Sequence, residues 1–216
     1  MIAEFIDRYV QEKLEKEERD NSKFRVSDAG RCRYMRFLKR LGVEFSDKYE
    51  NRVLRVFEVG HVFHRWLQDA LEEKGLLFAK EYEVQDKHRL GHIDAIVKTE
   101  EGLVLYDFKT VHSKKFNYLD KVGVDEHYSM QAVSYYLLLP EEIRKEIVDV
   151  RIAYISKDDL RIAEFSVLSP EVIEKTEEDW EVLITAWEKG KEPEKNPKEW
   201  ECGYCPYKTL CLNKEV

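Results

Sequence analysis

Hydrophobic residues recur with helical spacing in the first third of the chain. From Ile2 to Arg19 they return every three or four positions, which predicts an amphipathic helix packed on the core. A second helix is predicted to begin at a cap on Ser27 or Asp28 and to end near Gly42. A third is predicted from about Asn51 to Lys74, with a buried stripe made of Val56, Val59, Phe63, Trp66, Leu67 and Ala70.

The spacing changes to period two after Gly75, which predicts strands. Phe78–Gln85 forms the first, and His92–Val97 and Leu103–Phe108 form a hairpin. If Glu100 and Glu101 make its two-residue loop, the numbers of cross-strand partners sum to 201 and Asp94 lies opposite Asp107. Alternate side chains of a strand share a face, so Asp107 and Lys109 then share one with Asp94. A slip of one residue would turn Asp94 to the other face.

The rest of the chain alternates helix and strand. The polar segment Val111–Val124 is predicted to be a loop beside a site. The remaining elements are a helix over Asp125–Leu139, strands over Val148–Ser156 and Leu160–Leu168, and a helix from Pro170 through Trp187. This order predicts one α/β domain over residues 1–216, with a mixed central sheet flanked by helices.

Charge and hydropathy narrow the class of protein. A net charge of −8 argues against a general nucleic-acid coat, and no apolar run is long enough to span a membrane. We therefore expect a soluble cytoplasmic protein without a membrane partner. One basic run, which is either a phosphate-binding patch or a solvated helix face, has no acidic residue between Asp28 and Glu44 and comprises Arg31, Arg33, Arg36, Lys39 and Arg40.

The predicted hairpin carries the candidate chemistry. Directly opposed carboxylates have Cβ atoms roughly 4.5–5.5 Å apart and repel unless a cation lies between them. Together with Lys109 they indicate a site for a divalent metal and a phosphate, although a solvated strand face with alternating charge would explain the same pattern. Further features favour the site: Gly91 precedes Asp94, His64 borders the stripe of the third helix, and Gln131 and Tyr135 share a helix face.

The four cysteines form a second constellation. Cys202, Cys205 and Cys211 follow the spacing C-x2-C-x5-C, and Cys32 stands alone near the other end. Disulfides are unusual in an intracellular chain, whereas four zinc thiolates or a cluster joining the two ends are both compatible with the spacing. Free thiols are a further alternative.

These residues resemble the ordered motif set of RecB-type nucleases in the PD-(D/E)XK superfamily. The matching segments are Gly60–His64, Gly91–Asp94, Asp107–Lys109 and Gln131–Tyr135, and the resemblance runs from about Ser27 to Cys211. It implies a restriction-endonuclease-like core and a metal-dependent deoxyribonuclease, an exonuclease acting on single-stranded DNA or DNA ends. In that reading Lys109 orients the attacking water, and Gln131 and Tyr135 position the DNA. Mn²⁺ or Mg²⁺ would be bound by His64, Asp94, Asp107 and the backbone carbonyl of Phe108.

The one-plus-three cysteine arrangement is similar to that of the iron–sulfur subset, which includes AddB and the CRISPR-associated Cas-four family. It implies a [4Fe–4S] cluster on Cys32, Cys202, Cys205 and Cys211, in an annex formed by residues 27–42 and 200–212. A free-standing chain of this size most resembles Cas-four, which implies spacer acquisition with CRISPR integrase proteins as partners. The basic run would then guide single-stranded DNA.

Two other functions fit the same motifs. One is a recombination or viral-replication exonuclease of the same fold. The other is a non-catalytic DNA-binding assembly subunit, which the intact His64, Asp94, Asp107 and Lys109 argue against.

Overall fold

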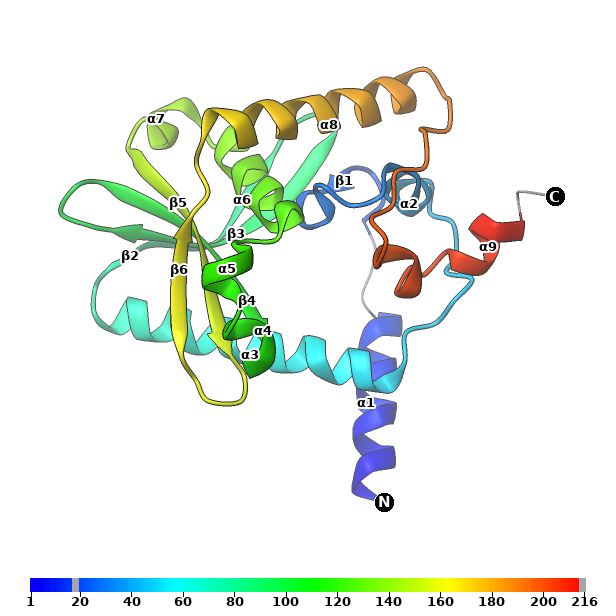
Figure 1. Ribbon diagram of the computed structural model, residues 1–216, viewed down its shortest axis with the longest axis horizontal. Helices are drawn as coiled ribbons and strands as arrows, with labels where there is room; N and C mark the ends of the chain where they lie inside the picture. Colours follow the sequence, from blue (N-terminus) through cyan, green and yellow to red (C-terminus); the bar gives the residue numbers. More distant parts are fainter. Residues whose placement is uncertain (17–19, 214–216) are drawn as a thin grey trace.

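A mixed six-stranded sheet forms the centre of the computed structural model, which describes residues 1–16 and 20–213 (Figure 1). The strands are β1 (Phe24–Arg25), β2 (Leu77–Gln85), β3 (Arg89–Lys98), β4 (Leu103–Val111), β5 (Ile147–Ser156) and β6 (Ile162–Ser166). Their order is β1-β3-β4-β5-β6, and β2 also pairs with β3. The β1–β3 and β4–β5 pairs are parallel and the others antiparallel, so the expected mixed sheet is confirmed.

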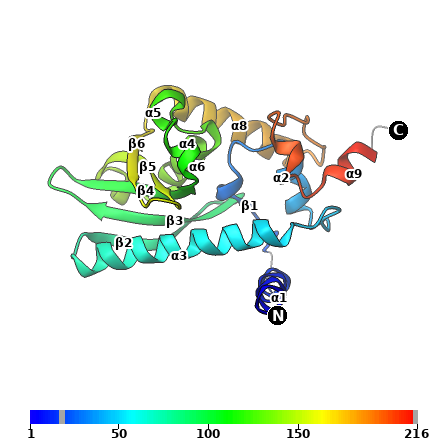
Figure 2. The ribbon, with the colours of Figure 1, turned by 60° about the horizontal axis from the view of Figure 1, so that its bottom comes forward.

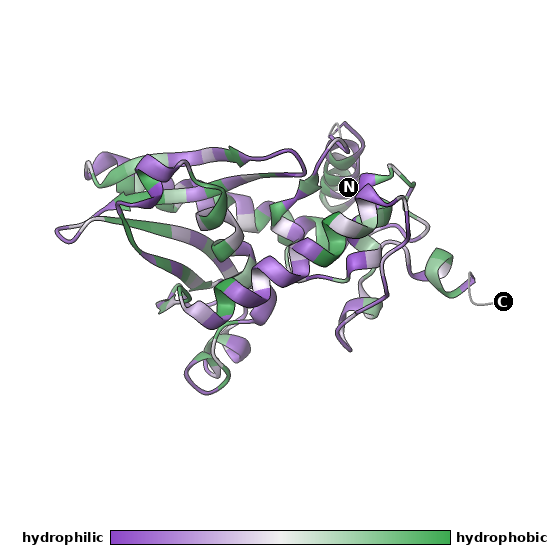
Figure 3. Ribbon diagram, turned by 90° about the horizontal axis from the view of Figure 1, so that it is seen from above, coloured by the Kyte–Doolittle hydropathy of each residue, from purple (hydrophilic) through white to green (hydrophobic). Residues whose placement is uncertain are grey.

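Helices cover both faces of this sheet. In Figure 2, α3 (Asn51–Glu73) lies below it, and α6 (Glu126–Leu138) and α8 (Pro170–Glu188) lie above it. Figure 3 shows helices banded in both colours, as expected of amphipathic helices. The other helical segments are α1 (Ile2–Lys16), η1 (Val26–Asp28), α2 (Arg33–Arg40), α4 (Ser113–Phe116), α5 (Leu119–Val122), α7 (Glu141–Arg144), η2 (Glu201–Gly203) and α9 (Lys208–Asn213).

Two apolar clusters fill the space between the sheet and its covering layers. The larger includes Ile93, Leu105 and Tyr154, and it contains Ala132 and Tyr135 of α6. The smaller includes Val97, Phe108 and Ile155, against which Phe63, Leu67 and Leu71 of α3 pack. None of the helices among residues 1–16 and 20–213 is long and apolar enough to cross a membrane.

The hairpin has the predicted register. Ala95 pairs with Tyr106, Ile96 with Leu105, Val97 with Val104 and Lys98 with Leu103, so each pair sums to 201. Thr99 and Gly102 close the loop through a 2.9 Å backbone hydrogen bond. The ladder ends at Ala95 and Tyr106, one position before the two carboxylates. Beyond it β3 remains paired with β2, and β4 with β5, so the two strands diverge at Asp94 and Asp107.

The stripe predicted for α3 is only partly correct. Phe63 and Leu67 face the core, but Val56, Val59 and Trp66 are 40–49% exposed. The most buried residues of this helix are Leu54 and Gln68. The helix is turned in this way because its inward face also carries the polar side chains of the site.

Three further expectations differ from the structure. The helix predicted over Ile2–Arg19 was expected to pack on the core, but only Val10 of α1 is buried; its predicted end at Arg19 lies outside the described residues. Helix α2 starts at Arg33 with Cys32 as its cap, because the chain turns at Gly30, which has a φ of +67°. The segment Val111–Val124 contains α4 and α5 instead of a plain loop.

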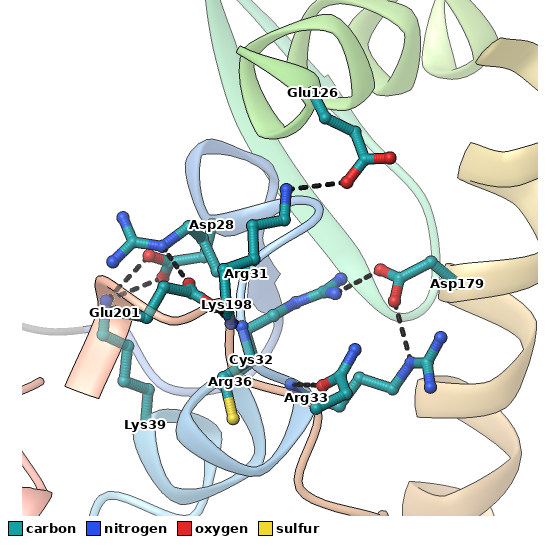
Figure 4. Close-up of polar contacts among 11 residues, drawn as sticks. Asp28, Arg31, Cys32, Arg33, Arg36, Lys39, Glu126, Asp179, Lys198 and Glu201 are labelled. Atoms are coloured by element: carbon teal, nitrogen blue, oxygen red, sulfur yellow. Dashed lines mark hydrogen bonds and ion pairs between the residues drawn. The ribbon is translucent and has the colours of Figure 1, made fainter.

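The annex joins two segments that are far apart in the sequence. Residues 27–42 and 200–212 lie side by side (Figure 1, right), and Cys32, Tyr34, Met35, Leu38 and Tyr207 form a small apolar cluster there. Glu201 is buried and accepts hydrogen bonds from Arg31 Nε at 2.5 Å and from the Cys32 backbone N–H at 3.3 Å (Figure 4). Polar and apolar contacts therefore connect the two segments.

Asp179 of α8 holds α2 against the rest of the protein. Its carboxylate accepts a 2.8 Å hydrogen bond from Arg33 Nε and pairs with the buried Arg36 (Figure 4).

Because Asp179→Ala leaves a buried guanidinium without its counter-charge, we expect a loss of about 3 kcal/mol in the free energy of unfolding, measured by urea denaturation. Glu178→Ala, at the exposed neighbouring position, is the control and should change it by less than about 0.5 kcal/mol. Equal effects would contradict this role.

Candidate active site

A cleft of ≈ 830 Å³ contains the site predicted from the hairpin. Its walls come from α3, β2, β3, β4, α6 and the annex. The cleft brings together every side chain of the predicted catalytic and metal set, namely His64, Asp94, Asp107, Lys109, Gln131 and Tyr135. Phe108 lies between two of them on β4, with its side chain buried on the α3 side of the sheet.

Asp94 is fixed from three directions. Its Oδ2 accepts a 2.7 Å hydrogen bond from the Phe108 backbone N–H, and its Oδ1 lies 3.3 Å from His64 Nδ1. Its own carbonyl accepts a 2.9 Å hydrogen bond from Gln68 Nε2. The side chains of α3 and the backbone of β4 thus supply the contacts that a regular ladder would have given at this position.

Asp107 is 1% exposed and lies among partners from β4 and α6. Its Oδ2 is 2.6 Å from Lys109 Nζ, and its Oδ1 accepts a 3.0 Å hydrogen bond from Gln131 Nε2. Gln131 Nε2 is also 3.1 Å from the Tyr135 hydroxyl. Lys109 lies 4.8 Å from the ring centre of Tyr128, so an aromatic face supports the ammonium from the other side.

The two carboxylates respond differently to this environment. Burial, together with the charge of Asp94, outweighs Lys109 and raises the pKa of Asp107 to about 6. Burial also acts to raise the pKa of Asp94, but His64 and Lys109 lower it below its usual value. Burial alone would lower the pKa of Lys109, yet both carboxylates raise it, so this side chain is an ammonium at neutral pH.

Sequence reasoning missed two residues of the site. Gln68 donates to both Asp94 O and Glu81 Oε1, at 2.9 and 2.7 Å. Its position four residues after His64 on α3 was an available signal, because such residues share a helix face. Glu81 lines the cleft from β2, opposite Asp94, with a φ of +47°. A backbone conformation of this kind costs on the order of 1–3 kcal/mol relative to a regular strand, and the sequence does not predict it.

Gly91 is explained by packing. A Cβ at this position would lie 2.6 Å from Tyr135 Cε1 and 2.7 Å from Val26 Cβ. The small residue therefore lets Tyr135 approach β3, whereas the sequence suggested the close approach of a ligand.

His61 lines the cleft and lies 3.4 Å from Glu58, and His92 lies 3.6 Å from Glu83.

The basic run does not form a free solvated face. Arg31 pairs with Glu201, Arg33 and Arg36 pair with Asp179, and Lys39 pairs with Asp28 at 2.8 Å (Figure 4). Arg40 stacks over the rings of Phe24 and Trp187, 4.4 and 4.1 Å from their centres. Of the five residues, Arg31 and Lys39 line the catalytic cleft. Tyr34 and Phe37 are buried core residues, at 3% and 5% exposure.

The four cysteines line one apolar cavity of ≈ 120 Å³ in the annex. Cys32 is buried, Cys205 and Cys211 are partly exposed, and Cys202 is exposed. Burial raises the pKa of the Cys205 thiol, and the other three cysteines are close enough to raise it further. The predicted set therefore converges on a single place in the fold.

The chemistry of the donor set in the cleft suits a divalent cation. Two carboxylates and an imidazole are ordinary ligands of Mn²⁺ or Mg²⁺, and one of the carboxylates is buried and costly to ionise without a positive partner. Within the described part of the chain no group of three or more His, Cys, Asp or Glu is arranged to hold a metal ion. In this arrangement His64 and Lys109 partly neutralise the carboxylates.

Comparison with known proteins places the chain in a class. Its sequence matches the PD-(D/E)XK nuclease superfamily over residues 6–212. The chain belongs to this superfamily, whose members are metal-dependent nucleases that use divalent cations such as Mg²⁺ or Mn²⁺. The restriction-endonuclease-like core is thereby confirmed at the level of the fold.

A crystal structure of SSO0001 has a similar fold. It superposes with a TM-score of 0.62 at 23% sequence identity, covering 99% of this chain and 97% of that one. At this identity the likeness concerns the fold alone. None of the curated proteins searched matches the chain.

The raised pKa of Asp107 predicts a pH limit for metal binding. Above about pH 6 the carboxylate is ionised and can bind Mn²⁺; as the pH falls through about 6 it takes up a proton and the ligand is lost. We expect a hundredfold excess of Mn²⁺ over its Kd to raise Tm by roughly 5–10 °C at pH 7.5, and by much less at pH 5.

Differential scanning fluorimetry with Mn²⁺ or EDTA measures this effect. Asp107→Asn is the control and should remove the metal-induced rise at both pH values. A rise of the same size at pH 5 and pH 7.5 would contradict the assignment of Asp107.

Proposed function

We propose that the protein is a divalent-metal-dependent DNA nuclease, an exonuclease acting on single-stranded DNA or DNA ends. The observation that carries the proposal is the convergence of Asp94, Asp107 and Lys109 in one cleft, at the divergence of β3 and β4. Membership of the superfamily supports nuclease activity in general. The preference for DNA and for ends is our inference from the motif resemblance and from the lining of the cleft.

His64, Asp94, Asp107 and the Phe108 carbonyl are proposed to hold the metal. When bound, a divalent cation lowers the pKa of a coordinated water and polarises the phosphoryl oxygen. Lys109, an ammonium beside Asp107, is positioned to orient a water molecule and to stabilise negative charge that develops on the phosphate. Gln131 and Tyr135 keep Asp107 in place, and Gln68 does the same for Asp94.

The lining of the cleft supports a single-stranded substrate. Arg31, Lys39 and Arg65 add positive charge along the walls. Phe57 and Tyr204, which come from α3 and from the annex, are 46% and 68% exposed at the same cleft. Exposed aromatic side chains next to cationic ones are typical of sites that stack unpaired bases and track a phosphate backbone.

We further propose that the annex holds a [4Fe–4S] cluster on Cys32, Cys202, Cys205 and Cys211. The cavity supports this, because four thiols around ≈ 120 Å³ leave room for a group larger than one ion. A single water molecule, for comparison, needs about 10–15 Å³ of such a cavity. The cluster would hold the Cys32 segment against the C-terminal segment, and with it Tyr204 and Arg31 at the cleft.

The biological context that we propose is CRISPR spacer acquisition with integrase proteins as partners. It rests on the resemblance of the motifs and cysteines to the Cas-four family. A pull-down with CRISPR integrase proteins tests it, and a nuclease that works in recombination or viral replication would not be retained.

Removing the central charges should abolish cleavage without unfolding the protein. We expect Asp107→Asn and Lys109→Met to lower kcat at least about 10²-fold on end-labelled single-stranded DNA with Mn²⁺. Lys114→Ala, at an exposed nearby position, is the matched control. Circular dichroism establishes that each variant is folded. Retained cleavage in either folded variant would refute the site.

The cluster has its own test. Protein purified without oxygen should be brown and contain about four irons per chain. Cys202→Ser should lower both the iron content and Tm, whereas Tyr204→Phe, outside the cysteine cavity, should change neither. A colourless preparation containing zinc would replace the iron–sulfur assignment with a zinc site.

A further inference from the structure

A second cavity lies next to the catalytic cleft, on the other side of an ion pair. Its volume is ≈ 630 Å³, and it shares Ser27, Asp28 and Lys39 with the cleft. Lys39 Nζ donates to both carboxylate oxygens of Asp28, at 2.8 and 2.9 Å, so this pair is the partition between the two spaces. We call the second cavity the arginine pocket, because Arg25, Arg36 and Arg40 line it.

Two of these arginines are buried yet keep unused donors. Arg36 is 2% exposed, and its Nε and Nη2 have no hydrogen-bond partner among the described residues; only its Nη1 pairs with Asp179. Arg40 is 9% exposed, and within the same part of the chain its Nε has no partner either. A buried donor without an acceptor is costly, and a guanidinium has a geometry that matches a phosphate.

Arg25 completes the set from β1. It is partly exposed, and its guanidinium forms no hydrogen bond or ion pair with the residues described by the structure. Lys23 and Lys39 also line the pocket, against the acidic Asp20, Asp28 and Glu44. Positive side chains are thus in excess there, although the whole chain carries a net charge of −8.

The position of the pocket relates it to the chemistry. His92 lines the arginine pocket and Asp94 lines the cleft, and both are on β3. They are two residues apart, which corresponds to roughly 6–7 Å along a strand, so the two spaces meet on β3. This separation is comparable with that of successive phosphates in an extended nucleic-acid strand.

We propose that the arginine pocket binds the phosphate next to the one that is cleaved. An extended strand that places its scissile phosphate at Asp94 and Asp107 passes the Lys39–Asp28 partition and delivers the neighbouring phosphate to Arg25, Arg36 and Arg40. This inference rests on the proposed nuclease function and adds a specific subsite to it.

The test removes the charge from either partner of the contact. Oligothymidylates carry one neutral methylphosphonate linkage, placed one nucleotide to either side of the scissile bond. With the wild-type protein and Mn²⁺, one of the two placements should raise KM about tenfold relative to the all-phosphate strand. In Arg25→Ala the same placement should raise KM clearly less than in the wild type, because one of the three arginines proposed to contact this phosphate is gone.

Matched variants separate the contact from general effects. Arg25→Lys keeps the charge and should restore much of the penalty. Lys145→Ala, on an exposed lysine after α7 at the other end of the molecule, should keep the full tenfold penalty (Figure 1). A penalty of equal size in the wild type and in folded Arg25→Ala, or none at either placement, would overturn the subsite.

The outcome also distinguishes this proposal from the nuclease function. If the wild-type protein cleaves no DNA, the proposed function fails, and fluorescence anisotropy of the same labelled strands then decides about the pocket. Weaker binding of the methylphosphonate strand, with a smaller difference in Arg25→Ala, would retain the arginine pocket as a phosphate site. Equal binding of both strands would reject it.

Discussion

The divergence of β3 and β4 at two carboxylates is the constraint on which the site depends. The ladder ends at Ala95 and Tyr106, and on the other side the pairing of β2 with β3 passes from Lys80–Ala95 to Tyr82–Ile93 without Glu81 and Asp94. A strand opened on both sides needs substitutes for its lost hydrogen bonds. Gln68 and the Asp94 carboxylate supply them, so the groups that hold the backbone open also hold the side chains of the proposed site.

The opened strand explains the electrostatics of the cleft. Asp107 stays on a buried part of β4, where its ionisation is opposed by low polarity and by Asp94. Lys109 is two residues away on the same face and offsets part of this penalty. The protein thus maintains negative charge that its own cations only partly neutralise, which is the condition under which a divalent cation binds well.

Much of this could be predicted from the sequence. The turn residues predicted the register of the hairpin, which the structure has. The alternation of side chains along the strand predicted that Asp107 and Lys109 share a face, and their side chains are in contact. The order of the motifs predicted that His64, Gln131 and Tyr135 belong to the same site, and all three line the cleft. They can meet there because the helices before and after the strands pack against the sheet. Glu81 could not be found, since its position depends on a backbone distortion. The burial of Arg36 and Arg40 could not be predicted from the sequence either, because their partners Asp179 and Trp187 are more than 140 residues away in the chain.

The basic run shows why charge alone is a poor guide to binding. The sequence indicated either a phosphate-binding patch or a solvated helix face. Each of the five cations instead has an intramolecular partner, and two of them are nearly inaccessible. What distinguishes Arg36 and Arg40 is the donors left over after those partners are counted. Asp179 and the rings of Trp180 and Trp187 fix both guanidinium groups in place, so little side-chain entropy remains to be lost on binding an anion. The ion pairs that remove the run from the surface therefore preorganise it for a phosphate that enters from the cleft.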